Sequence, residues 1–251
     1  MTLFSVITVT KNHLSGLKHT CASLKLQTCT DLEWIVIDGA SADGTVDFLR
    51  AQTLPYLHWV SEIDGGIYEA MNKGIERAAG DYLLFLNAGD TLADAHVFEH
   101  IAELTKGQPD FIYGDSFEGS HYKRARGVST ILTGMFTHHQ AMFYRRDALG
   151  LMRYHTPYRI AADYDLTLRF LTPEKNVTYF PTPVCIFEQG GISQRAATQG
   201  RKEQYRSRRK NGACSTCLNV AIYCAQSFLY LLRKYVPHIY WDLKKFTAHD
   251  P

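Results

Sequence analysis

Residues Ser61–Asp90 read SEIDGGIYEAMNKGIERAAGDYLLFLNAGD, and their successive features decide the fold. A Gly-Gly pair precedes an amphipathic helix expected over Ile67–Ala79, where apolar residues recur with helical spacing. The apolar run DYLLFLN then predicts a strand buried on both faces, and it ends in the small-residue acidic loop Asn87–Asp90. Open α/β sheets bind ligands outside the carboxyl ends of their strands, so this loop is a candidate binding site.

The residues before this stretch predict two more strand–helix units. Leu3–Thr10 and Leu32–Asp38 are apolar runs rich in β-branched residues, typical of buried strands. A helical period follows the first run over residues 14–27, and a second helix is expected to begin near Asp43. The segment LHWVSE predicts another short strand. Strands and helices that alternate at this spacing predict βαβ units and a doubly wound sheet.

The second half of the chain continues the alternation with weaker patterns. We expect a helix after Asp90, a strand ending at Asp115, a loop or edge hairpin over Ser116–Gly134, and a strand running into a helix within HHQAMFYRRDAL. ADYDLTLRFL has a helical period, and NVTYFPTPVCIFEQGGIS predicts two short strands. The predicted fold class is α/β, with a Rossmann-like, mostly parallel central sheet flanked by helices.

The composition changes after residue 194, so we divide the chain into an α/β domain, residues 1–194, and a C-terminal helical extension, residues 195–251. The extension has eleven Lys/Arg and three Asp/Glu, a local charge of +8 that leaves −6 on residues 1–194. Its largely apolar run LNVAIYCAQSFLYLL is shorter than the roughly 20 residues that span a bilayer. Two alternatives stay open: an amphipathic helix in an anionic membrane surface, or a helix packed on the protein's own core.

Composition also bounds the compartment and excludes function classes. No charged leader with a cleavage site precedes the first apolar run, so we expect a cytoplasmic protein. The six cysteines are scattered, which favours free thiols over zinc despite the Cys214/Cys217 C-x-x-C pair. The turn TVTKNHLSGL lacks the Gly-rich phosphate loop of dinucleotide-dependent oxidoreductases and nucleotidyltransferases. The basic tail has few interleaved aromatics, so we expect no nucleic-acid partner.

Four acidic residues close or follow the strand–helix units: Asp38, Asp64, Asp90 and Asp163. Each alone is more often a helix cap than a functional group, but the carboxyl ends of parallel strands converge on one crevice. Such a crevice suits a nucleoside-diphosphate sugar. The diphosphate needs a hard cation such as Mg²⁺ or Mn²⁺ held by a few oxygen ligands, and transfer from the anomeric carbon needs a general base.

Five motifs resemble the family 2 inverting glycosyltransferases of GT-A fold: ITVTKN, EWIVIDGASADGT, SEIDGGIYEAMNKGIERAAGDYLLFLNAGD, ADYDL and GGIS. The resemblance covers about Leu3–Ser193, and it looks closest to small transferases of bacterial exopolysaccharide operons, notably those of colanic acid synthesis. It implies transfer from a UDP- or GDP-sugar donor, with inversion and with Mg²⁺ or Mn²⁺ as cofactor. The implied acceptor is a saccharide, free or linked to a polyprenyl diphosphate, used by an enzyme peripheral on the inner face of the cell membrane.

The resemblance also implies a role for each matching position. Asp38 would accept a hydrogen bond from the base, Asp90 would hold the metal, and Asp163 would be the catalytic base. The other implied residues are Thr10, Asn12, Asp64, Lys73, Asn87 and Ala88 toward the donor, and His138, His139, Gly190 and Gly191 toward the acceptor.

Two departures from the family pattern matter. The D-x-D metal motif reads Asn87-Ala88-Gly89-Asp90, so one charged ligand is missing and the metal depends on a single carboxylate. Asp165 stays an alternative to Asp163 as the base. Two residues apart on a helix, the two side chains diverge by about 200°, so only one can face the substrate. We expect Asp165 to cap the helix or to pair with Arg169.

Three further expectations concern neighbouring features. At most one of His138 and His139 reaches the site, because adjacent residues on a strand point to opposite faces. The residues Arg195, Arg201 and Arg206 lie in reach of a diphosphate, but a solvated or lipid-facing run is favoured. The lost acid keeps a rival open, a non-catalytic or degenerate membrane-associated member of a polysaccharide assembly complex. Retention of Asp90 together with Asp163 favours catalysis.

Overall fold

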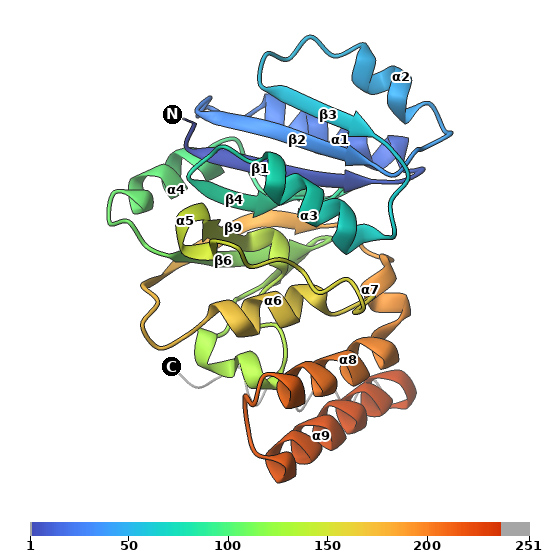
Figure 1. Ribbon diagram of the computed structural model, residues 1–251, viewed down its shortest axis with the longest axis vertical. Coiled ribbons are helices and arrows are strands. Elements are labelled where there is room, and N and C mark those ends of the chain that lie inside the picture. Colours follow the sequence, from blue (N-terminus) through green and yellow to red (C-terminus); the bar gives the residue numbers. More distant parts are fainter. Residues whose placement is uncertain (1, 237–251) are drawn as a thin grey trace.

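One curled, mixed sheet of nine strands is the centre of this computed structural model, which describes residues 2–236 (Figure 1). The strand order is β3-β2-β1-β4-β8-β6-β9-β5, and β7 pairs with the C-terminal part of β6. The strands are β1 (Phe4–Thr10), β2 (Leu32–Asp38), β3 (Leu57–Ser61), β4 (Tyr82–Phe85), β5 (Thr91–Leu92), β6 (Phe111–Glu118), β7 (His121–Lys123), β8 (Met142–Arg145) and β9 (Val177–Phe187).

Helices cover both faces of this sheet. Apolar side chains of α3 and α6 belong to one buried core, and those of α1, α2 and α4 belong to the other. The helices are α1 (Leu14–Lys25), α2 (Thr45–Arg50), α3 (Ile67–Arg77), α4 (Val97–Thr105), α5 (Arg146–Leu149), α6 (Ala162–Phe170), α7 (Ile192–Arg195), α8 (Ala197–Lys210) and α9 (Thr216–Tyr235), with 3-10 turns η1 (Val128–Thr133) and η2 (His139–Ala141).

The first half of the sheet is parallel, as the βαβ pattern predicts. β1 lies between β2 and β4 and is parallel to both, and β2 is parallel to β3. Every residue of β1 and β2 is buried, which explains why both read as apolar runs without alternation. Thr10 and Asp38, the last residues of these strands, are register partners at one edge of the sheet.

The second half of the sheet is mixed. β8 is antiparallel to its neighbours β4 and β6, whereas β6 and β9 are parallel. The prediction of two short strands in NVTYFPTPVCIF is wrong, because β9 is one strand of 11 residues. Its pairing with β6 shifts register on both sides of Asp115. Pro181 and Pro183 have no N–H to donate, and the irregular register lets the strand continue past them.

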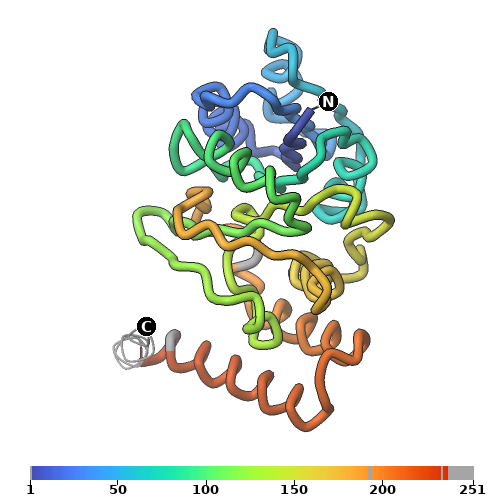
Figure 2. Tube along the Cα trace, turned by 90° about the vertical axis from the view of Figure 1, so that its left-hand side faces the viewer, coloured from blue at the N-terminus to red at the C-terminus, as the bar shows by residue number. Residues whose placement is uncertain are grey.

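The C-terminal helices α8 and α9 form a hairpin beneath α6 (Figures 1 and 2). Arg208 of α8 is fully buried and joins the two helices to the body. Its guanidinium donates to Asn219 Oδ1 of α9 at 2.6 Å and to the Leu132 carbonyl at 3.1 Å. The last part of the predicted extension, residues 237–251, lies outside the described residues.

The two sides of α9 differ. Asn219 and Ile222 are buried on its inner side, whereas exposed apolar side chains line its outer side, among them Val220, Phe228 and Leu231. Over residues 2–236, no helix has the length and hydropathy needed to cross a bilayer. The helix therefore combines features of both predicted alternatives: it packs on the protein and presents an apolar outer side.

Candidate active site

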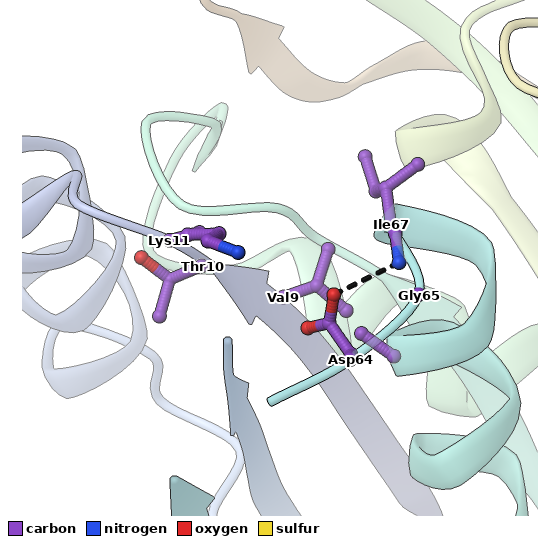
Figure 3. A pocket seen from close by; sticks show the side chains of 8 residues that line it. Val9, Thr10, Lys11, Asp64, Gly65 and Ile67 are labelled. Carbon is purple, nitrogen blue, oxygen red and sulfur yellow. Dashed lines mark hydrogen bonds between the residues drawn. The ribbon is translucent and has the colours of Figure 1, made fainter. Parts of the chain in front are cut away.

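A cavity of about 720 Å³ lies at the carboxyl ends of β1 and β4. Its wall comes from distant parts of the sequence: the segments after these two strands, α3, the region of η2 and α6, and the turn after β9. A smaller cavity of about 370 Å³ shares Val9, Thr10, Lys11 and Ile67 with it (Figure 3). This is the place where an open α/β sheet binds its ligands.

Most of the predicted site residues line these cavities. Asp64 lines the smaller one, and Thr10 lines both. The predicted residues around the larger cavity are Thr10, Asn12, Asn87, Ala88, Asp90, His139, Asp163, Gly190 and Gly191. The fold therefore brings the acidic loop and the candidate base to one crevice.

The loop Asn87–Asp90 is held by helix α1. The Thr20 hydroxyl donates to the Asp90 carbonyl at 2.7 Å and accepts from the Gly89 amide at 3.1 Å. Gly89 has a φ of 103°, a left-handed conformation that glycine adopts at little cost. The small residues of this loop thus permit the turn that carries Asp90 into the cavity wall.

Asp90 is only 3% exposed. Its Oδ1 accepts from the Glu188 amide at 2.9 Å, and its Oδ2 accepts from the Gln140 side chain at 2.7 Å. Burial raises the pKa of Asp90 to about 6, although both hydrogen bonds oppose the shift. Ionised Asp90 is therefore unfavourable here, and a cation beside it would offset that penalty.

The oxygen atoms near Asp90 fit Mg²⁺ or Mn²⁺. Asn87 Oδ1 is buried without a hydrogen-bond partner in the described part of the chain, and a Cβ on Gly89 would overlap the Glu188 carboxylate, which lies directly over the loop. Both ions prefer oxygen ligands and keep waters or phosphates in their shells. No cluster of three or more His, Cys, Asp or Glu able to hold a metal occurs within residues 2–236.

Asp64 opens the turn that leads into α3 (Figure 3). Its Oδ1 accepts from the Gly66 amide at 2.9 Å, and Gly66 has a φ of 132°. The Arg159 guanidinium donates to the Gly65 carbonyl at 2.6 Å. Arg159 thereby joins this turn to the segment that precedes α6.

Asp163 lies in the first turn of α6, at the wall of the larger cavity. Its Oδ1 accepts from the Tyr164 amide at 2.8 Å and lies 3.3 Å from the Tyr68 hydroxyl. Its Oδ2 lies 3.6 Å from His139 Nδ1, and the side chain is 21% exposed. An oriented carboxylate that stays accessible can accept a proton from a bound hydroxyl group.

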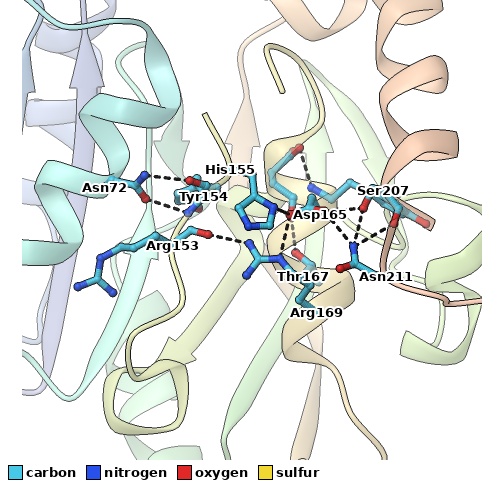
Figure 4. A network of polar contacts seen from close by, with 11 residues as sticks. Asn72, Arg153, Tyr154, His155, Asp165, Thr167, Arg169, Ser207 and Asn211 are labelled. Atoms are coloured by element: carbon cyan, nitrogen blue, oxygen red, sulfur yellow. Dashed lines mark hydrogen bonds and ion pairs between the residues drawn. The ribbon is translucent and has the colours of Figure 1, made fainter. Parts of the chain in front are cut away.

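Asp165 is fully buried in a polar network between α6 and α8 (Figure 4). Its Oδ2 pairs with Arg169 Nε at 2.9 Å, the pair expected from the sequence. Its Oδ1 accepts from Ser207 Oγ at 2.7 Å and from the Asn211 side chain at 3.1 Å. These contacts make Asp165 a structural residue, and of the two acids it is Asp163 that faces the cavity.

Two predicted donor residues make local contacts away from the cavity linings. The Asp38 carboxylate is fully buried and accepts from the Ser41 amide at 3.0 Å and the Ser61 hydroxyl at 2.6 Å. Lys73 pairs with Glu62 at 2.8 Å. The Asp38 carboxylate thus stabilises the loop after β2, and its partner Ser61 comes from a neighbouring strand. That Asp38 accepts a hydrogen bond from the base of the donor stays a prediction.

Of the adjacent histidines, His139 lines the cavity, while His138 packs behind it. The His138 ring stacks on Phe187, with 4.5 Å between ring centroids, and its Nδ1 lies 2.9 Å from Ser116 Oγ. Lys123 Nζ lies 3.2 Å from its Nε2. Burial and the Lys123 charge lower the pKa of His138 to about 3, so its ring is neutral near pH 7.

Several lining residues were not in the predicted set. Arg195, for which a solvated position was favoured, reaches the cavity wall, whereas Arg201 lies over the Tyr230 ring at 4.1 Å. Glu188 directly precedes the Gln-Gly-Gly turn, so its position next to the predicted Gly190 and Gly191 could have identified it from the sequence. The remaining residues of this kind include Lys11, His13, Gln140 and Arg159.

Comparisons with known proteins agree with this geometry. Residues 5–196 match the sequence profile of "Glycosyl transferase family 2". A PGL/p-HBAD biosynthesis glycosyltransferase of Mycobacterium bovis (strain BCG / Pasteur 1173P2) is 34% identical over 204 residues, which is 76% of this chain and 79% of the relative. An uncharacterized glycosyltransferase of Mycobacterium tuberculosis (strain CDC 1551 / Oshkosh) is 34% identical over 201 residues, 75% of this chain and 76% of its own.

Two solved structures share the fold. S. aureus TarS 1-349 in complex with UDP-GlcNAc has a TM-score of 0.67 at 16% identity, over 93% of this chain and 73% of that one. The mannosyltransferase PcManGT from Pyrobaculum calidifontis, in complex with GDP-Man and Mn²⁺, has a TM-score of 0.66 at 16% identity, over 98% of this chain and 79% of that one. These likenesses show a fold of the GT-A type. The profile match and the close relatives go further: the chain belongs to glycosyl transferase family 2.

Proposed function

We propose that this glycosyltransferase moves a sugar from a UDP- or GDP-sugar to a hydroxyl group of a lipid-linked saccharide, with inversion. One observation carries the proposal: the Asp163 carboxylate and the Asn87–Asp90 loop line the same cavity as Lys11, Arg159 and Arg195. Cationic side chains suit a diphosphate, and sugar transfer needs a base. The UDP-GlcNAc and GDP-Man bound by the two structural neighbours support a nucleotide-sugar donor.

In the proposed reaction, Asp163 accepts the proton of the attacking hydroxyl group. The hydroxyl oxygen bonds to the anomeric carbon while the bond from that carbon to the diphosphate breaks on the opposite face, and this single displacement inverts the carbon. The bonding electrons leave with the nucleoside diphosphate. Lys11, Arg159 and Arg195 stabilise its negative charge, and Tyr68 and His139 keep the Asp163 carboxylate oriented.

Asn87, Asp90 and Glu188 would hold Mg²⁺ or Mn²⁺ in this proposal. Charge neutralisation at the departing diphosphate is the chemistry that the bound ion would supply. Because an amide replaces one acid of the D-x-D motif, we expect weaker metal binding than two carboxylates in the loop would give.

We further propose a cytoplasmic enzyme that binds peripherally to an anionic membrane, where a polyprenyl-diphosphate-linked acceptor lies. Support comes from the outer side of α9, where large apolar side chains such as Phe228 and Leu231 are exposed, beside the basic helix α8. Such an amphipathic pair suits a membrane surface. The roles in exopolysaccharide, capsule or colanic acid synthesis rest on the sequence resemblance alone, since the M. bovis relative is named for PGL/p-HBAD biosynthesis.

Donor binding and turnover together test the proposed reaction. Thermal melts with UDP-glucose, UDP-galactose, UDP-GlcNAc and GDP-mannose, each with and without Mn²⁺, should show a donor that raises the melting temperature, because ligands of the native state stabilise it. Asp163→Asn should keep that shift and lower turnover by about 100-fold or more. Unchanged turnover would refute the base assignment, and donor binding without any turnover would favour the degenerate rival.

Binding to vesicles of phosphatidylethanolamine and phosphatidylglycerol tests the membrane proposal. The Phe228→Ser/Leu231→Ser double variant should lose co-sedimentation that the wild type shows. Leu151→Ser is the matched control, because Leu151 is a 94% exposed apolar residue outside the hairpin. A wild type that never binds vesicles would refute the proposal. So would a concentration-dependent dimer that the double variant abolishes, since a second copy would then cover this side of α9.

A further inference from the structure

Helix α6, which carries Asp163, begins without a capping side chain of its own. Its N-cap residue is Ala161, whose methyl group cannot accept a hydrogen bond. The start of a helix leaves backbone amides without intrahelical partners, and such groups are costly when buried. Glu203 of α8 instead binds the segment that leads into the helix: its Oε2 accepts from the Ile160 and Ala161 amides at 2.8 and 2.9 Å, and its Oε1 accepts from the Arg159 amide at 3.0 Å.

Glu203 is itself fixed in this position. The residue is 4% exposed, and the Gln199 side chain donates to its Oε1 at 2.9 Å. The backbone of α8 comes close to the same segment at Gly200, where a Cβ would lie 3.1 Å from Ile160 Cγ2. A carboxylate with this many charge-assisted hydrogen bonds has little freedom to move, and neither does the backbone that it holds.

Tyr68 of α3 fixes the same segment from the other side. Its hydroxyl lies 2.8 Å from the Ile160 carbonyl and 3.3 Å from Asp163 Oδ1. Ile160 is therefore bonded at its N–H by Glu203 and at its carbonyl by Tyr68. Asp163 follows three residues later, so a displacement of this segment would move its carboxylate relative to the cavity.

We propose that Glu203 is a positioning residue for sugar transfer, which sets the angle at which α6 presents Asp163 to the acceptor. The proposal rests on the role of Asp163 as the base. It makes α8, which lies beyond the 194/195 division drawn from composition, a working part of the active site. Glu203 acts through the α6 backbone, and small misplacements of a reacting group are enough to slow catalysis strongly.

Glu203→Gln is the direct test. The glutamine side chain keeps the volume, but its NH₂ group faces amides that also donate, so part of the hydrogen bonding to residues 159–161 is lost. Turnover is measured as release of the nucleoside diphosphate from the panel donor with the largest melting shift, with octyl β-glucoside as acceptor. We expect kcat to fall about 10- to 100-fold with the donor KM within about 2-fold. Lys202→Gln, an exposed neighbour on α8, should retain wild-type values.

A double variant separates positioning from a general structural defect. In an Asp163→Asn background, Glu203→Gln should change the residual rate by less than about 2-fold, because the group that it positions is gone. Equal losses in both backgrounds, or an unchanged kcat for Glu203→Gln alone, would overturn the proposal. Failure of the proposed function looks different, because Asp163→Asn would then keep full turnover.

A second variant covers the case in which Glu203→Gln does not fold by circular dichroism. Gly200→Ala leaves the carboxylate intact and presses on Ile160, so it should lower kcat by a smaller factor of about 3 to 10. That loss should also vanish in the Asp163→Asn background. A loss that persists there, or no loss at all, would count against positioning by α8.

Discussion

The Asp90 carboxylate, which the proposed metal binding needs in its ionised form, lies where burial disfavours its charge. Its pKa is about 6 in the folded chain against 3.8 as the ordinary value, so this group's favourable contribution is complete below pH 3.8 and lost as the pH rises through 6. In metal-free buffer at pH 7, Asp90→Asn should therefore raise the free energy of unfolding by roughly 1 to 3 kcal/mol, and it should have no such effect at pH 4. Urea unfolding at the two pH values measures this.

Mn²⁺ provides the complementary measurement on the same pair of proteins. The ion should raise the melting temperature of the wild type in the presence of donor and leave that of Asp90→Asn unchanged. The metal assignment would be contradicted if the wild type were less stable than Asp90→Asn in metal-free buffer but its melting temperature did not respond to Mn²⁺ either.

Individual residues of the cavity wall were predictable where they sit at the ends of strands and helices. Thr10, Asn87 and Asp163 are of this kind, because the βαβ pattern places such ends at one edge of the sheet. Asp38 also ends a strand, but the hydrogen bond that it accepts from the Ser61 hydroxyl depends on the pairing of two strands, which a linear sequence does not report. Residues such as Arg159 belong to no motif and become visible only in the folded chain.

Helix α3 approaches β1 so closely at Gly74 that a Cβ there would overlap Ile7 Cγ2. Gly74→Ala should lower the free energy of unfolding by about 1 to 3 kcal/mol, because overpacking outweighs the better helix propensity of alanine. Gly107→Ala is the control, since its nearest heavy atom is 3.6 Å from the added Cβ. Chemical denaturation compares them, and equal stability of the two variants would mean that α3 can move away from the sheet.

Helix α6 carries two acids with opposite expected behaviour. Asp165→Asn should lower the free energy of unfolding by about 2 to 4 kcal/mol, because it breaks a buried pair with Arg169 and weakens the bonds to α8. Its folded fraction should retain turnover. Asp163→Asn should do the reverse, with stability within about 1 kcal/mol of the wild type and turnover largely lost. Urea unfolding and activity are measured on both variants. If Asp165→Asn loses turnover and Asp163→Asn loses stability, the two roles have been assigned to the wrong residues.

The pH dependence of the whole molecule includes a contribution from His138. Its pKa is about 3 in the folded chain against 6.5 as the ordinary value, so its stabilising contribution is present above pH 6.5 and lost as the pH falls toward 3. Between pH 7 and pH 5 this loss is about 2 kcal/mol. His138→Gln should show a correspondingly smaller drop in the free energy of unfolding than the wild type. The imidazole resonance of His138 is identified by its absence from the spectrum of His138→Gln. If that resonance titrates near pH 6.5, the lowered pKa is wrong.

At the scale of the molecule, the α/β class and the parallel first half followed from the alternation of apolar runs and helical periods. The order of the second half did not, because β8 pairs between β4 and β6, and no periodicity reports which strands become neighbours. The continuity of β9 through Pro181 and Pro183 was equally hidden. Local pattern specifies elements well and long-range pairing poorly.

The dependence of α6 on Glu203 has a consequence for how the protein is made. A growing chain emerges from the ribosome in order, and its N-terminal parts begin to fold first. The strands that shape the donor crevice can therefore assemble while the residues after 200 are still being synthesised. We expect the nascent enzyme to bind its nucleotide sugar before it can transfer the sugar. Transfer should begin only after α8 and α9 have packed against α6.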